Sequence, residues 1–141
     1  MSTYRSDIEN ALVSKLASYS DAQGVEVEWG NADASFTANS DVYVRETNLM
    51  GDTNQAGLGK DGVDVTIGVY QLDIFARAGT SKWESLEIAD DLANLYKRGS
   101  VLSFNGVDVT LTGVSIKPGG KDGSWFQTIV EVRYRVYTDP R

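Results

Sequence analysis

Two segments of this sequence repeat apolar residues at the interval of an α-helix, and each of them precedes a group of β segments. In residues 4–19, Ile8, Leu12 and Leu16 stand four positions apart, which places them along one face of a helix. Residues 81–97 carry a second apolar stripe of the same kind. Two such stripes have to be covered by the rest of the chain, which limits the fold to helices packed on strands.

Most of the remaining chain alternates apolar and polar residues, as half-buried strands do. The alternation predicts strands over residues 25–29, 41–49, 63–78, 101–104, 107–117 and 124–137. We predict antiparallel hairpins from the second and third strands and from the last two. The order α-β-β-β-α-β-β-β then predicts an α+β fold, a two-layer sandwich in which two helices cover one face of a mainly antiparallel or mixed sheet. A chain of 141 residues suits one such domain, over residues 1–141.

The third strand has an irregular pattern. Its apolar residues stand at odd positions up to Val69 and at even positions from Tyr70 onwards. A one-residue change of phase moves apolar side chains to the opposite face of a sheet. The pattern therefore predicts either a β-bulge or a strand whose two halves pack on different partners.

Residues 50–62 contain four glycines and are predicted to form a flexible loop. The acidic residues there lack the ordered spacing of a calcium-binding loop, and Gly57 to Lys60 lacks the spacing and the following helix of a phosphate-binding P-loop. Long loops of this kind usually serve a function, and here we expect contact with a partner. The candidate contact residues are Met50, Asp52, Leu58, Lys60 and Asp61.

Composition excludes several kinds of chemistry. The chain has no cysteine and no histidine, so it has no disulfide, no thiolate metal site and no Ser-His-Asp or Cys-His machinery. We identify no catalytic, cofactor-binding or metal-binding residue, and we expect neither an enzyme nor a cofactor. The net charge of −7 disfavours specific binding of nucleic acid, and no segment approaches the roughly 20 apolar residues needed to cross a membrane.

Four further residues are candidates for contacts between subunits. Trp83 lies in the first turn of the second helix, off its apolar stripe, and Trp125 points away from the main apolar face of the last strand. Exposed tryptophans are frequent anchors of protein interfaces, although burial in the core is the alternative. Arg133 and Arg135 share the outer face of that strand with Glu131. That face is either solvated or, if covered, one whose alternating charges set the register between copies.

The order and spacing of these segments resemble those of a known family. The likeness runs through the opening helix around residues 7–16, the strand ending at Trp29, and the segments 42–45, 70–75, 89–92 and 122–134. In this respect the chain resembles the tail terminator, or tail completion, proteins of long-tailed bacteriophages. The individual motifs are short, and the likeness extends over nearly the whole chain.

The resemblance implies a structural role in the virion. Tail terminators form a ring, typically of six copies, that caps the head-proximal end of the tail tube, stops its polymerisation and offers a surface to the head connector. The implied partners are other copies of the chain, the tube protein and the connector, with genomic DNA passing through the ring. The alternatives are another neck or head-closure protein, and a small ligand-binding domain or hydrolase with a deep pocket of convergent carboxylates.

Overall fold

The structure is a computed structural model that describes residues 4–30, 38, 40–78 and 82–139. The described elements are, in chain order, α1 (Tyr4–Gln23), β1 (Glu26–Glu28), β2 (Val42–Gln55), β3 (Asp64–Arg77), α2 (Lys82–Leu95), β4 (Val101–Phe104), β5 (Val107–Asp122) and β6 (Trp125–Thr138). The predicted α+β class is confirmed. The two predicted hairpins, β2–β3 and β5–β6, are antiparallel as expected.

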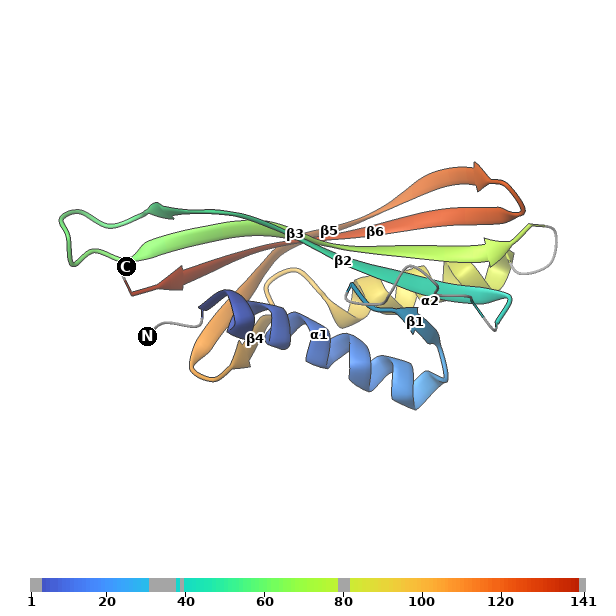
Figure 1. Cartoon of the computed structure of the whole chain (residues 1–141), viewed down its shortest axis with the longest axis horizontal. Coiled ribbons are helices and arrows are strands. Elements are labelled where there is room, and N and C mark those ends of the chain that lie inside the picture. The colour runs from blue at the N-terminus through green and yellow to red at the C-terminus, as the bar shows by residue number, and fades with distance from the viewer. Residues whose placement is uncertain (1–3, 31–37, 39, 79–81, 140–141) are drawn as a thin grey trace.

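The strands form one mixed sheet in the order β1-β2-β3-β6-β5-β4 (Figure 1). β1 runs parallel to β2, and the other neighbours are antiparallel. The sheet curls into a half-barrel, so the predicted two-layer sandwich is confirmed only in part. Long strands twist, and bulges in β2 and β5 add curvature. Both helices lie on the same, concave side of the sheet (Figure 1), which we call the inner face.

The core lies between the helices and the inner face. The predicted stripe of α1 is fully buried there, and α2 contributes Ile88, Ala89 and Leu92. The even-numbered residues of β6 from Val130 to Val136 also face inward. Trp29 packs against this cluster as a half-buried side chain.

β3 keeps one phase over its whole length. Its pairing with β6 continues without a register shift, and every even position from Thr66 to Ala76 is buried. The bulge lies in the neighbouring strand, between Met50 and Thr53. The odd-numbered apolar residues at the start of β3 therefore point to the outer face, where Ile67 is 61% exposed. The predicted bulge is therefore not in β3, and the change of phase places the apolar side chains of its two halves on different faces of the sheet. That the outward half packs on a different partner stays a prediction.

The Gly-rich segments contain more strand than predicted. Residues 50–62 were expected to be loop, but β2 resumes its pairing at Thr53 and continues to Gln55, which leaves residues 56–63 as the connection. Met50 belongs to β2 and packs against the core. Likewise β5, predicted to end at residue 117, continues to Asp122, with a register shift between Pro118 and Gly120. A β-bulge accommodates residues that interrupt the alternation of apolar and polar side chains. The hydrogen-bonded pairing of two strands can therefore continue through a segment rich in glycine.

Candidate interaction surfaces

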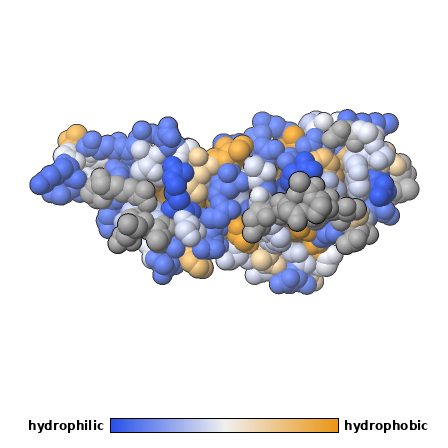
Figure 2. Space-filling model, viewed as in Figure 1, coloured by the Kyte–Doolittle hydropathy of each residue, from blue (hydrophilic) through white to orange (hydrophobic). Residues whose placement is uncertain are grey.

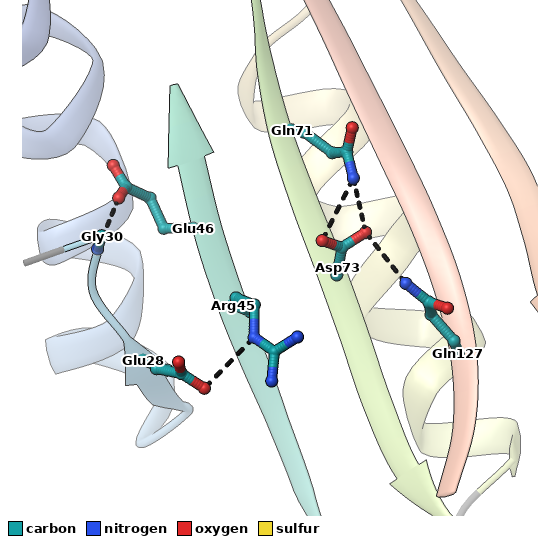
Figure 3. A network of polar contacts seen from close by, with 7 residues as sticks. All are labelled: Glu28, Gly30, Arg45, Glu46, Gln71, Asp73 and Gln127. Carbon is teal, nitrogen blue, oxygen red and sulfur yellow. Dashed lines mark hydrogen bonds and ion pairs between the residues drawn. The ribbon is translucent and has the colours of Figure 1, made fainter. Parts of the chain in front are cut away.

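A buried carboxyl group joins the sheet to the segment that follows β1. Glu46 projects from β2 to the inner face and is only 3% exposed. Its Oε2 accepts a hydrogen bond of 2.8 Å from the Tyr70 hydroxyl. Its Oε1 accepts one of 2.8 Å from the amide of Gly30 (Figure 3). Each carboxylate oxygen thus has a donor, as a buried charged group requires.

Burial raises the pKa of Glu46 above its ordinary value. The carboxyl group of Glu9, on α1, raises this pKa further, whereas the hydrogen bonds from Tyr70 and Gly30 lower it. Burial also raises the pKa of the Tyr70 hydroxyl, so this hydroxyl stays protonated and remains a donor at neutral pH. The contribution of Glu46 to the free energy of folding therefore depends on whether its carboxyl group is ionised.

We predict that Glu46→Gln stabilises the protein increasingly as the pH rises. The folded state holds the Glu46 proton to a higher pH than the unfolded chain, in which glutamate has a pKa of about 4.3. The stability that Glu46 contributes is therefore fully present below that value and is lost as the pH rises through the folded pKa. Glutamine is neutral throughout and can still bond to both partners. Urea unfolding from about pH 4 to 7 measures the difference in unfolding free energy between variant and parent.

Glu84→Gln, on the exposed surface of α2, is the matched control, because Glu84 is in solvent in both states. It is measured over the same pH range and shows what the loss of an exposed carboxyl group does to stability. A difference for Glu46→Gln that does not change with pH would contradict the assigned role of burial.

A second polar chain ties α1 to the inner face. The Tyr134 hydroxyl donates to Asn48 Oδ1 at 2.7 Å, and Asn48 Nδ2 donates to Glu9 Oε2 at 2.7 Å. Beside it lies an open hollow of about 440 Å³, lined by Glu9, Asn10, Val13, Trp29, Gly30 and Glu46. Across the described residues, no group of three or more histidine, cysteine, aspartate or glutamate residues is arranged to hold a metal ion.

The middle of the outer face is polar and internally bonded. Asp73 is buried and accepts hydrogen bonds from Gln71 Nε2, at 3.0 Å, and from Gln127 Nε2, at 3.3 Å (Figure 3). Arg45 forms an ion pair with Glu28 of β1, with 3.2 Å between Nε and Oε1. These polar groups of β1, β2, β3 and β6 are therefore bonded to one another. We assign them a role in holding the strands together.

One end of the outer face carries a cluster of aromatic residues and arginines. The rings of Tyr43 and Phe75 stack with 5.1 Å between centroids, and Trp125 meets Tyr43 edge-on. The guanidinium group of Arg77 lies 4.6 Å from the centroid of the Trp125 ring. Trp125 does point to the outer face as predicted, but contacts within the chain leave it only half exposed.

The opposite end of the outer face carries exposed aliphatic residues beside two arginines. Arg133 pairs with Val69 in the register of β3 and β6, and Arg135 pairs with Ile67. Leu49 of β2 lies opposite Val69, and Tyr137 follows Arg135 on the same face. We call this set the arginine–aliphatic patch: Leu49, Val65, Ile67, Val69, Arg133, Arg135 and Tyr137. Sequence reasoning selected the two arginines and missed the aliphatic residues, although the odd-numbered apolar positions of β3 were a usable signal.

The other candidates lie apart from this patch. Trp83 is 78% exposed on α2, and Leu58 is 99% exposed in the connection 56–63 with Lys60 and Asp61. Asp52 is the exception, because it is exposed at the bulge of β2, opposite the part of β3 that contains Ile67, and so borders the patch. The 56–63 connection lies at the far end of the sheet, at the left in Figure 1, where Figure 2 shows a mainly hydrophilic surface. The predicted candidates therefore occupy separate surfaces and do not converge on one site.

None of the described helices combines the length and the apolar character needed to cross a membrane.

These features define an α+β domain with a curled mixed sheet, helices on its concave side, and charged and apolar residues gathered on its outer face. A solved structure has the same fold: it aligns with 99% of this chain and 100% of its own, with a TM-score of 0.76 and 21% sequence identity. A search of curated proteins finds no match. The sequence matches the phage tail terminator protein family over residues 7–134, and the chain belongs to that family. It is a structural protein of a phage tail.

Proposed function

We propose that this chain forms a ring that caps the head-proximal end of the tail tube, stops tube polymerisation and provides the surface for head attachment. The observation that carries the proposal is the family match over residues 7–134, which includes both helices and nearly the whole sheet. The complete domain, and not an isolated motif, thus has the sequence of a tail terminator. The proposed ring has about six copies, and genomic DNA passes through it.

Two partners follow from this position: the tube protein on one axial side and the head connector on the other. The 56–63 connection projects at one end of the sheet and carries the almost fully exposed Leu58 (Figure 1). We assign this connection to one of the axial contacts, because an exposed apolar side chain at a projecting tip loses most of its solvent contact on docking.

Electron microscopy of a phage that lacks this protein tests the proposal. The expected result is overlong tails without heads, and supplying the protein from a plasmid should restore tails of normal length with heads attached. Normal tail lengths in its absence would reject the terminator role. Headless tails of normal length would instead indicate a head-closure protein.

The Leu58→Asp variant tests the axial contact. We expect its unfolding free energy to change by less than about 0.5 kcal/mol, because the side chain is in solvent. Plasmid complementation should nevertheless fall by at least about tenfold, because a buried charge opposes docking. Ser18→Asp, on the exposed side of α1 and away from the connection, is the control for added charge. Equal complementation by both variants would remove Leu58 from the interface.

A further inference from the structure

We infer that the arginine–aliphatic patch of one copy binds the exposed face of α2 in a second copy, a contact that rests on the proposed ring. The patch combines apolar area with positive charge. Leu49, Ile67 and Tyr137 are each more than half exposed. Exposed apolar side chains that adjoin one another, and are bordered by charge, are typical of surfaces that bind protein.

The two arginines are held in place without a carboxylate partner. Arg133 lies across Gly113, where a Cβ atom would stand 2.6 Å from Nη2, and donates to Ser115 Oγ at 3.1 Å. Arg135 lies over the ring of Tyr137, with its guanidinium carbon 5.6 Å from the centroid. The ion pairs found in the described part of the chain involve other residues. Both positive charges are thus oriented on the outer face and available to a partner.

The exposed face of α2 has the complementary character. Trp83 stands at its N-terminal end, and Glu84, Glu87, Asp90 and Asp91 are all exposed. At 100° per residue, Trp83, Glu87 and Asp90 fall in one narrow stripe along the helix. Asp91 accepts a hydrogen bond from the Tyr19 hydroxyl, and no ion pair of the described residues includes any of the four carboxylates. The helix therefore offers an aromatic anchor followed by negative charge.

The two surfaces complement each other in both properties. Trp83 can pack on the aliphatic residues of β2 and β3, while the carboxylates of α2 meet Arg133 and Arg135. Among the exposed carboxylates that border the patch, Asp108 accepts a hydrogen bond from Ser103 Oγ, and Asp52 lies at the bulge of β2. The ion pairs of the described residues join neither of them to Arg133 or Arg135. Opposite charges across an interface select the partner and its register, and buried tryptophan and arginine supply much of the binding energy.

The partner is a second copy because these surfaces cannot meet within one chain. The patch lies on the outer face of the sheet, and α2 lies on the inner side (Figure 1). Each copy therefore offers two different surfaces that are complementary to each other. Such a heterologous contact gives a ring when the rotation between copies closes, and an open filament when it does not. The closed ring is the geometry that the proposed function requires.

Cross-linking in assembled tails tests the pairing, because the natural chain contains no cysteine. Phage carrying the double variant Ile67→Cys/Trp83→Cys would be grown, and the purified tails treated with a flexible bismaleimide. We expect a ladder of cross-linked oligomers of this chain. A mixture of the two single-cysteine variants should give dimers only. Ser18→Cys, on the exposed side of α1, combined with Trp83→Cys is the matched control and should give no ladder.

The outcomes separate the pairing from the proposed function. Suppose the chain is present in tails, the control variant gives a ladder of cross-linked oligomers and the Ile67→Cys/Trp83→Cys variant does not. The pairing is then overturned, and the terminator role stands. If the natural chain itself is absent from purified tails, the terminator role fails and the pairing fails with it. If only the Ile67→Cys/Trp83→Cys variant is lost from the tails, its substitutions have weakened the contact, as the pairing predicts, and the charge exchange below decides. Thermal unfolding of each purified variant excludes misfolding as the cause.

Charge exchange provides an independent measurement. Arg133→Glu/Arg135→Glu and Glu87→Lys/Asp90→Lys should each reduce plasmid complementation by at least about tenfold, because like charges then face each other. Combining all four substitutions in one chain should recover most of the loss. Failure of the combined variant to improve on either pair, with each protein folded, would overturn the pairing.

Discussion

Replacing Gly68 with alanine should lower the free energy of unfolding by about 2–4 kcal/mol, through overpacking and a lost buried hydrogen bond. Gly68 stands opposite Tyr134 on the inner face, and the Tyr134 ring covers it. A Cβ atom at position 68 would stand 3.0 Å from Cε2 of that ring and closer still to its hydroxyl end. The ring is fully buried and cannot move outward without disturbing its neighbours.

The same displacement would break the polar chain to α1, because the Tyr134 hydroxyl donates to Asn48, which in turn donates to Glu9. Urea unfolding monitored by circular dichroism measures the loss. Gly113→Ala is the matched control, since its Cβ would meet the guanidinium end of the exposed Arg133 side chain, which can move aside. Its effect should stay within about 0.5 kcal/mol.

A double-mutant cycle separates the ring contact from a general cost of alanine in the strand. In a Tyr134→Ala background, Gly68→Ala should cost little, because the space that the ring occupied is then free. An equal loss in both backgrounds would show that the Tyr134 ring is not the reason for glycine at this position.

Truncating Leu12 to alanine is expected to cost about 2–5 kcal/mol, the range for a fully buried leucine. Leu12 is the central residue of the apolar stripe of α1 and is 0% exposed. Its carbonyl oxygen accepts a buried hydrogen bond of 2.8 Å from the Tyr96 hydroxyl. This bond joins α1 to the residue that follows α2. Alanine would leave a cavity at the place where the two helical segments meet.

Chemical unfolding of Leu12→Ala should show a lower midpoint and an unchanged dependence on urea concentration. Leu12→Met nearly conserves the volume and should cost less than about 1.5 kcal/mol. Val13→Ala removes a half-buried side chain beside the open hollow and should cost less than Leu12→Ala. A loss for Val13→Ala as large as that for Leu12→Ala would indicate that α1 is not held mainly by its central stripe.

The sequence predicted only some of the residues of the interaction surface. Alternation in β6 placed Arg133 and Arg135 outward, and the phase change in β3 pointed to apolar residues on two faces. Whether those residues adjoin one another depends on the pairing of β3 with β6, whose partners are far apart in the chain. Trp125 shows the reverse case: its direction was predicted, but its contacts with Tyr43 and Arg77 come from other strands.

The sequence by itself determined which segments are helix or strand and which side of α1 and β6 is buried, because a local period reports burial directly. The absence of histidine and cysteine also limited the available chemistry without any structure. The tertiary structure alone decided the place of parallel β1, the extension of β2 and β5 through their bulges, and the burial of Glu46 beneath Tyr70. Those features depend on contacts between residues that are far apart in the sequence, and a local sequence pattern does not predict such contacts.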